Sequence, residues 1–418
     1  VLPYSKVPVY LIENADYFDR DGIYGDPHEF PDNDRRFIFF SRAVFETAKT
    51  LQIRPDIIHA HDFHTAMTMA FLKSQYRLDY HFTRTAGVYT IHNLGYQGWW
   101  DPGRAMDLST FGREGFYPGC WFEKNGLFNA MKAGIMFADK ITTVSPTYAK
   151  EIRMPWYSEG MQNELNQRGA DLIGVLNGVY YDEWNPQADD QIFQNYDIDS
   201  LEKKKINKSE YLKSFGIDEH DNNYTPLLGM VTRLTEQKGI DLVRSKIEKY
   251  IAENKFRLTL LGTGEKHHEE YFRKLQNKYP KNVLLTIGYD NKLAHKLIAA
   301  SDFFLMPSKY EPCGLTQMYS LKYGTIPVVR KTGGLADTVA EYKPHSGEGN
   351  GFVFLHYWDD DFEYAMNRAI RLYSKMPHWD IIRKNAMSVD FPSSKTALEY
   401  LKVFRWALQK VRGKNGKK

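Results

Sequence analysis

The sequence predicts an α/β fold of two doubly wound domains, and three observations support this prediction. At 418 residues the chain fits two domains of roughly 150–200 residues, each large enough to hold its own core. Short apolar runs alternate with amphipathic stretches of helical period, the pattern of parallel sheets covered by helices. Polar and glycine residues gather where the apolar runs end, which is the edge at which such sheets bind ligands.

We expect a first domain over residues 1–190 and a second over 191–388. A polar stretch at 180–200, followed by a lysine-rich helix at 201–216, is the best interdomain linker. The helical pattern at 389–418 is expected to pack back on the first domain. The basic tail at 410–418 is expected to be a solvated terminus.

The first half of the chain alternates predicted strands and helices. Buried strands are predicted at 8–14, 57–61, 88–92, 140–145 and 174–179. Helices are predicted at 34–52, 65–76, 126–139 and 146–152. Asn33 is expected to cap the first of these helices, and Pro146 lies in the first turn of the last.

The second half repeats this alternation more strictly. Strands are predicted at 226–234, 257–264, 282–289, 302–307, 326–330 and 351–355, and helices at 239–251, 291–301, 314–323 and toward the C-terminus. The acidic residues Asp359–Asp361 precede a helix, where they favour its positive end; we therefore do not interpret them as a metal-binding motif.

Residues 308–339 hold the densest run of polar and glycine residues. This run places a loop between a buried strand and a helix that Gly314 is expected to open, with Gly324 as its C-cap. The free backbone N–H groups of Gly314, Leu315 and Thr316 would point at an anion. Glu311 carries the wrong charge for a phosphate and is expected to accept hydrogen bonds from ligand hydroxyls. The alternative is an ordinary loop whose carboxylate favours the helix dipole.

Histidines follow two strands of the predicted first domain. His59, His61 and His64 lie close in sequence, but no fourth ligand is evident and we expect no metal. His92 and Asn93 follow the next strand, so both groups are expected at one sheet edge. A satisfied core histidine remains the alternative for each.

Arg233 and Lys238 flank a tight loop after the first strand of the second domain. Two fixed cations there could stabilise a departing diphosphate and replace a metal ion, so neither metal nor cofactor is expected. Simple solvation at the surface is the alternative for both.

Composition narrows the class of protein. A net charge of +3 offers no field that would recruit nucleic acid or membrane, and the sequence contains no apolar run of about 18 residues. Two cysteines without metal-ligand spacing fit a reducing cytoplasm. Aromatic residues make up 15% of the chain, which suits a large core or stacking on sugars.

The stretch EPCGLTQMYSLKYGTIPVVRKTGGLADTV resembles the C-terminal signature of bacterial glycogen synthases and plant starch synthases. The resemblance extends through YLIEN, HAHDFHTA, TIHNLGYQG, GVLNGV and RLTEQKG. It implies a GT-B fold, two Rossmann-like domains facing a cleft. It also implies transfer of glucose from ADP-glucose to the non-reducing end of an α-1,4-glucan with retention of configuration. The expected compartment is the cytoplasm, or the plastid in a plant or alga.

The resemblance also implies roles for single residues. Arg233 and Lys238 would bind the donor phosphates, Glu311 would grip the donor glucose, and His92 would contact it near its 6-hydroxyl group and the anomeric centre. Asp62 would line the same pocket. The remaining substrate-binding positions are Asn93, Asn177, Tyr289, Cys313, Gly314, Leu315 and Thr316. In this family, retention is explained by front-face attack, in which the leaving phosphate accepts the acceptor's proton.

Two departures from related families are visible. Tyr319 stands where many retaining families carry a second glutamate, as it does in bacterial glycogen synthases. The only Lys-Thr-Gly-Gly-Leu element is at 331–335, so we expect the chain to lack the first elements of the family's first sheet. The alternatives are another retaining GT-B transferase, a phosphorylase with pyridoxal phosphate on a lysine, or an inactive glucan-binding protein.

Overall fold

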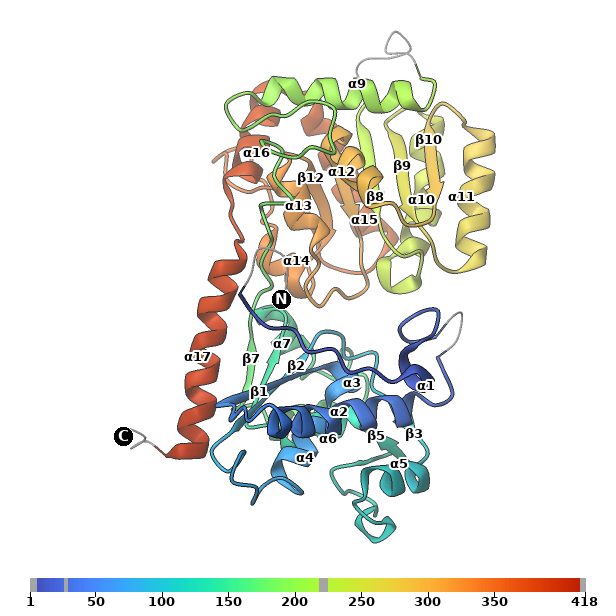
Figure 1. The fold of residues 1–418 in the computed structure, drawn as a ribbon. Coiled ribbons are helices and arrows are strands. Elements are labelled where there is room, and N and C mark those ends of the chain that lie inside the picture. Colours follow the sequence, from blue (N-terminus) through green and yellow to red (C-terminus); the bar gives the residue numbers. More distant parts are fainter. Residues whose placement is uncertain (1–5, 26–28, 218–224, 414–418) are drawn as a thin grey trace. The chain divides into compact units, whose positions relative to one another are not determined.

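The computed structural model describes residues 6–25, 29–217 and 225–413, which form two compact units (Figure 1). The first unit comprises the chain up to Thr143, then Ala149–Gly174 and the residues from Glu399 onward. The second comprises Val144–Tyr148 and Val175–Leu398. Residues 414–418 of the predicted basic tail lie outside the described residues.

A parallel four-stranded sheet forms the centre of the first unit. Its strands, in spatial order, are β1 (Ile57–His61), β2 (Ala86–Ile91), β6 (Lys140–Thr143) and β7 (Leu172–Gly174). Every residue of β2 is buried, as expected for a strand covered on both faces. A small antiparallel sheet, β3 (Trp99–Trp100), β5 (Leu127–Asn129) and β4 (Glu123–Lys124), belongs to the same unit.

Helices and large apolar side chains complete the first unit. The helices are α1 (Ala15–Phe18), α2 (Asn33–Thr50), α3 (Asp62–Thr65), α4 (Met67–Lys73), α5 (Pro102–Ser109), η1 (Arg113–Gly115), α6 (Ala130–Phe137) and α8 (Gln162–Gln167). Fully buried Phe45, Phe71, Tyr89 and Phe128 fill its core. Two further helices, α7 (Pro146–Glu151) and α17 (Ser393–Arg412), contribute residues to both units.

The second unit is built on a six-stranded parallel sheet. Its strands, in sequence order, are β8 (Leu227–Val231), β9 (Arg257–Gly262), β10 (Val283–Ile287), β11 (Phe303–Met306), β12 (Ile326–Arg330) and β13 (Phe352–Phe354). Their spatial order is β10-β9-β8-β11-β12-β13, the 3-2-1-4-5-6 order of doubly wound nucleotide-binding sheets. The order reverses between β8 and β11, so a ligand crevice is expected at the carboxyl ends of these two strands.

Helices connect the parallel strands of the second unit. They are η2 (Leu201–Lys203), α9 (Lys204–Ser214), η3 (Glu236–Lys238), α10 (Ile240–Ala252), α11 (Lys266–Lys278), α12 (Asn291–Ala300), α13 (Thr316–Lys322), α14 (Gly333–Thr338), α15 (Asp359–Tyr373) and α16 (Met376–Ser388). Helix α15 begins with three aspartates in its first turn, as predicted from the helix dipole.

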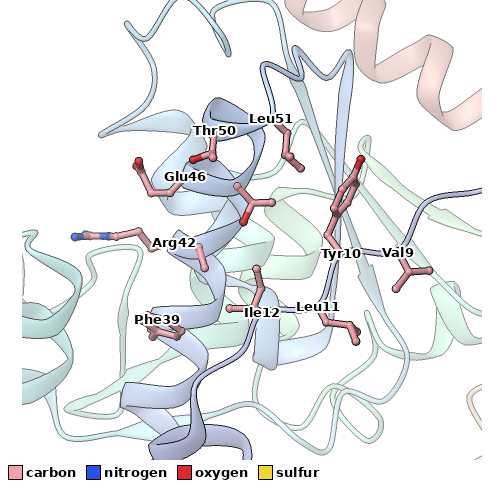
Figure 2. Close-up of a pocket in the computed structure, with 11 residues that line it drawn as sticks. Val9, Tyr10, Leu11, Ile12, Phe39, Arg42, Glu46, Thr50 and Leu51 are labelled. Carbon is pink, nitrogen blue, oxygen red and sulfur yellow. The ribbon is translucent and has the colours of Figure 1, made fainter. Parts of the chain in front are cut away.

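The predicted strand at 8–14 is wrong. Residues 8–14 form no strand, and the Leu11 side chain is 88% exposed. Figure 2 shows Val9–Ile12 running beside α2 as a loop, with a hollow of about 660 Å³ between them. An apolar run becomes a strand only when another strand pairs with it, and no strand of the described residues does so here.

Three other boundaries differ from the predictions. The predicted helix at 126–139 begins later because Leu127–Asn129 form β5, and the Asn129 side chain then caps α6 by accepting the N–H of Lys132 at 2.8 Å. Strand β7 ends at Gly174, before most of the predicted strand at 174–179. Helix α13 begins at Thr316 and not at Gly314, which has a left-handed φ of 70°.

The predicted cap of α2 is also displaced by one position. Asn33 is the first residue of this helix, and Asp32 precedes it. The Asn33 side chain instead donates to the Tyr24 carbonyl at 3.0 Å and accepts from Arg36 at 2.6 Å. Tertiary partners therefore outcompete local capping at this position.

No helix of the described residues is long and apolar enough to cross a membrane.

Candidate active site

A pocket of about 370 Å³ opens at the point where the strand order of the second unit reverses. The ends of β8 and β11 and the segments that follow them supply its walls. The lining residues are Met230, Val231, Thr232, Arg233, Lys238, Leu305, Met306, Ser308, Glu311, Gly314, Leu315 and Thr316. The structure therefore brings both predicted cations, the predicted carboxylate and three predicted loop residues to one cavity.

Lys238 and Glu311 form an ion pair within this pocket. The Lys238 Nζ atom lies 2.7 Å from Glu311 Oε2, and the Ser308 Oγ atom donates to the same oxygen at 3.0 Å. Glu311 and Ser308 are almost fully buried. Two donors on Oε2 fix the carboxylate in one orientation. Among the described residues none donates to Oε1, so this oxygen can accept from a ligand.

Arg233 lies on the exposed loop between β8 and η3. Its Nη2 atom is 3.4 Å from Gln237 Oε1. Gly239 ends η3 with a left-handed φ of 73°, and a Cβ atom there would lie 2.2 Å from the Pro307 carbonyl oxygen. This close approach ties the cation loop to the end of β11.

The loop at 311–313 packs against the glycine pair that opens α14. A Cβ atom on Gly333 would meet the Glu311 carbonyl oxygen at 1.9 Å, and one on Gly334 would meet that of Cys313 at 2.0 Å. The Gly334 N–H donates to the Glu311 carbonyl at 3.1 Å. These glycines therefore support the Glu311 loop by backbone contact.

Cys313 and Asn177 meet beside the same loop. Burial raises the pKa of the Cys313 thiol to about 12, although a hydrogen bond from the Asn177 backbone opposes the shift. The thiol is thus neutral near pH 7 and unsuited to be a nucleophile. Thr316, at the start of α13, directs its hydroxyl to Met306 Sδ at 3.3 Å.

Tyr289 follows β10 and is 90% exposed. Tyr319, where related families carry a glutamate, stacks on Trp184 with ring centroids 4.1 Å apart. Burial, followed by the charges of Glu183, Cys313 and Tyr289, raises the pKa of Tyr319 to about 12. Tyr319 therefore serves aromatic packing, while Tyr289 offers an open ring face.

Asp62, His92 and Asn93 come together in the first unit at the carboxyl ends of β1 and β2. Asp62 has a left-handed φ of 55°, a strained conformation for a residue with a side chain. Its Oδ1 atom accepts the backbone N–H of His92 at 2.8 Å, and the Asn93 N–H also contributes. Burial raises the pKa of Asp62 despite these donors and the nearby His92.

Two of the predicted histidines adjoin this group and one does not. His61 Nδ1 lies 3.0 Å from His92 Nε2, and the rings of His59 and His61 are 4.1 Å apart. His64 instead packs on Phe63, Phe37 and Tyr24. The three histidines therefore do not converge on one point.

One group of potential metal ligands occurs among the described residues, at the start of α11. It consists of Glu265, His267 and His268. The His268 Nδ1 atom is 3.1 Å from Arg244 Nη1, which can only donate. A neutral His268 then carries its proton on Nε2, the atom facing Glu265 at 4.0 Å, so that nitrogen has no lone pair for a metal.

Ser308 and Thr232 line the pocket although the sequence analysis did not propose them. Ser308 precedes Glu311 by three residues within the SKYE segment, a spacing at which a hydroxyl reaches a carboxylate across a turn. Thr232 directly precedes Arg233 after β8. Position at a strand end was the signal that could have identified both.

Comparison with known proteins identifies the family. Residues 1–167 match the family described as starch synthase catalytic domain, and residues 216–386 match glycosyl transferases group 1. Glycogen synthase of Pseudothermotoga lettingae is 45% identical over 414 residues, 98% of this chain and 82% of that protein. The chain belongs to the glycogen and starch synthase family. Glycogen synthase of Bacillus subtilis is 44% identical over 96% of this chain and 81% of its own length.

A solved member of this synthase family has the same fold. The catalytic domain of starch synthase IV from Arabidopsis thaliana, bound to ADP and acarbose, superposes with a TM-score of 0.85. It is 32% identical and the match covers 91% of this chain and 79% of that one. The predicted family and the GT-B class of two parallel-sheet α/β domains are confirmed, whereas the predicted roles of single residues stay predictions.

Proposed function

We propose that this synthase transfers glucose from ADP-glucose to the non-reducing end of an α-1,4-glucan, with retention of configuration. The observation that carries the proposal is the pocket of the second unit, in which a buried carboxylate and two cations meet at the sheet's reversal point. ADP as the nucleotide is supported by the starch synthase structure, which is bound to ADP and acarbose.

The cations of the pocket suit a leaving diphosphate. Lys238 and Arg233 line the same cavity of the second unit and bring two cationic side chains to it. Fixed positive charge stabilises the negative charge that develops on the departing phosphate oxygen. The exposed ring of Tyr289 is proposed to stack on the base.

The carboxylates and the imidazole suit the sugar. Glu311 presents Oε1 to the pocket while Oε2 is held by Lys238 and Ser308, so Oε1 can accept a hydrogen bond from a glucose hydroxyl. In the first unit, His92 and Asp62 offer a ring nitrogen and a carboxylate at two adjoining strand ends. We assign these residues to the donor glucose, His92 near its 6-hydroxyl group.

The reaction balances without a metal or a redox cofactor. The bond between the anomeric carbon and the phosphate oxygen breaks, and a bond from that carbon to the 4-hydroxyl oxygen of the glucan forms on the same face. The acceptor's proton passes to the leaving phosphate, and ADP departs with the bonding electrons. Lys238 and Arg233 lower the barrier by stabilising that charge.

We further propose a reducing compartment, the cytoplasm, as the place of this reaction. Both cysteines, Cys120 and Cys313, are free and buried. Proteins that use their cysteines in this way are typical of compartments that keep thiols reduced.

Incorporation of labelled glucose into glycogen from ADP-glucose and from UDP-glucose tests the proposal. We expect incorporation from ADP-glucose, weaker incorporation from UDP-glucose, and incorporated label that β-amylase releases completely as maltose. NMR of a maltooligosaccharide product should show only α-linkages. Glucan binding in calorimetry without incorporation from either donor would refute the enzymatic proposal and favour a binding protein.

A further inference from the structure

The rings of His61 and His92 meet in a contact that the proposed reaction does not itself require. Parallel pairing of β1 with β2 places His61 opposite Thr90, two residues before His92. Nδ1 of His61 then lies 3.0 Å from Nε2 of His92, with ring centroids 5.2 Å apart. A nitrogen-to-nitrogen distance of this length is a hydrogen bond, in which one ring donates and the other accepts.

We propose that His61 is a positioning residue, which fixes the ring orientation and the location of the proton on His92. The inference rests on the proposed role of His92 at the donor glucose. Once Nε2 of His92 is bound to His61, only its Nδ1 atom is available to a ligand. His61 thereby decides whether that available nitrogen donates or accepts.

A single proton occupies this contact near neutral pH. Burial, followed by the charge of His92, lowers the pKa of His61 to about 4, so His61 is neutral at pH 7. Burial also lowers the pKa of His59 to about 3, with smaller contributions from His61 and His92. His61 therefore enters the contact as a neutral ring, with the neutral ring of His59 beside it, and Asp62 accepts the backbone N–H of His92.

His59 has a separate hydrogen-bond chain and does not compete for this contact. Its Nε2 atom lies 2.6 Å from Thr90 Oγ1, which in turn lies 2.5 Å from Thr142 Oγ1. This chain runs across the sheet beneath the histidine pair. It holds the His59 ring in place, and the His61 ring remains available to His92.

The fold does not depend on the His61 ring. His61 is the last residue of the edge strand β1, and its ring is open to solvent on one side although His59 and His92 crowd the other. The turn into α3 is held by the backbone of His61. The His61 N–H donates to Thr65 Oγ1 at 2.6 Å, and the Thr65 hydroxyl donates back to the His61 carbonyl at 2.7 Å. A substitution at His61 therefore preserves these contacts and tests the ring alone.

The direct test is NMR of the imidazole nitrogens in protein labelled with ¹⁵N-histidine, since a protonated ring nitrogen and a bare one differ strongly in chemical shift. The His92 signals are assigned by their loss in His92→Gln. We expect His92 to hold one tautomer at pH 7 in the parent protein and to average between two tautomers in His61→Ala. Averaging already in the parent, or a single tautomer in His61→Ala, would overturn the proposal. This readout needs no activity, so it stands apart from the test of the proposed function.

Kinetics supply the second test. We expect His61→Ala to lower kcat about tenfold, with the KM for ADP-glucose changed less than about threefold, because a misplaced group slows the chemical step. His61→Asn, whose amide can occupy the position of Nδ1, should recover most of kcat. His345→Ala, at an exposed histidine of the second unit, is the control and should match the parent. Equal losses in His61→Ala and His61→Asn, both folded by circular dichroism, would contradict the positioning role.

Discussion

The two units place functional side chains at the same kind of sheet edge but equip it with opposite chemistry. In the second unit, Lys238 and Glu311 form a partly buried ion pair in a cavity that Arg233 also lines. In the first unit, the corresponding edge carries the neutral rings of His61 and His59 and a carboxylate, Asp62, whose pKa is raised by burial.

The same kind of sheet edge can therefore suit two kinds of ligand. Charged groups, fixed by partners, suit a ligand that carries charge, such as a diphosphate. Neutral donors and acceptors suit sugar hydroxyls, which are themselves neutral. Strand ends supply the position in both units, and the side chains placed there decide the ligand.

The largest expected effect comes from removing the charge of the second unit. We expect Lys238→Ala to lower kcat about 10³-fold, equivalent to about 4 kcal/mol of transition-state stabilisation. Glycogen binding, measured by affinity electrophoresis, should be unchanged. The control is Lys249→Ala. Lys249 lies on α10 of the same unit, and its ammonium group pairs with Glu363 at 2.9 Å. Equal losses of turnover and glucan affinity in Lys238→Ala would contradict the leaving-group role.

The next effect tests whether the Glu311 loop depends on its close backbone contact with Gly334. Gly334→Ala would place a Cβ atom 2.0 Å from the Cys313 carbonyl oxygen, so the Glu311 loop must shift. We expect a loss of about 3 kcal/mol in the free energy of unfolding, measured with urea, together with lower activity. Gly103→Ala is the matched control because its nearest contact, Asp101 Oδ1, is 3.5 Å away. A Gly334→Ala protein with the parent's stability would show that the loop is adaptable.

A smaller effect is expected from Asp171, whose ion pairs stabilise the first unit against unfolding. Burial alone would raise the pKa of Asp171, but hydrogen bonds from Lys410, Lys140 and Arg168 outweigh it and hold the pKa at about 2. Because this pKa lies below its ordinary value of 3.8, the stabilisation is complete above about pH 4 and is lost as the pH falls toward 2.

We therefore expect Asp171→Asn to lower the free energy of unfolding by about 2 kcal/mol at pH 7. Urea denaturation at several pH values should show this gap narrowing below pH 4. Asp107→Asn, at an exposed pair with Arg113, should cause no measurable change. A gap of unchanged size at pH 2 would mean that Asp171 acts through packing and not through charge.

The smallest effect is expected at Tyr289, which is proposed to bind the nucleotide by stacking and not by charge. Tyr289 is 90% exposed, so Tyr289→Ala should leave the melting temperature unchanged. We expect the KM for ADP-glucose to rise about tenfold, since a base stacked on an aromatic ring gains about 1–1.5 kcal/mol. Tyr289→Phe should behave like the parent. An unchanged KM in Tyr289→Ala would show that the base binds elsewhere.

Sequence periodicity predicted the second unit better than the first, for a physical reason. In the second sheet every strand pair except β8–β11 joins strands that follow one another along the chain, so each apolar run finds a partner nearby and is buried. Residues 8–14 show the opposite case, since their apolar character does not make a strand where no described strand pairs with them. Whether an apolar segment pairs depends on the presence of a neighbouring strand, which the segment's own sequence does not reveal.

The candidate site was predictable at the level of residue types. Lys238 and Glu311 stand out because charged residues at the ends of buried strands have no role in the core. Their direct bond, however, depends on the reversal of strand order between β8 and β11, which brings loops 73 positions apart into contact. The His61–His92 contact likewise follows from the β1–β2 register, so the sequence alone showed only that histidines follow both strands.

The anchoring of Glu311 has a consequence for the order of events. Lys238 and Ser308 occupy one oxygen of this carboxylate, so a sugar can engage only the other while the lysine stays. A phosphate that attracts the ammonium group leaves only Ser308 on Oε2, so this oxygen gains room to accept a hydrogen bond from a neighbouring hydroxyl. A nucleotide sugar would thus open both Glu311 oxygens to its own glucose. Free glucose brings no phosphate and would bind to Oε1 alone.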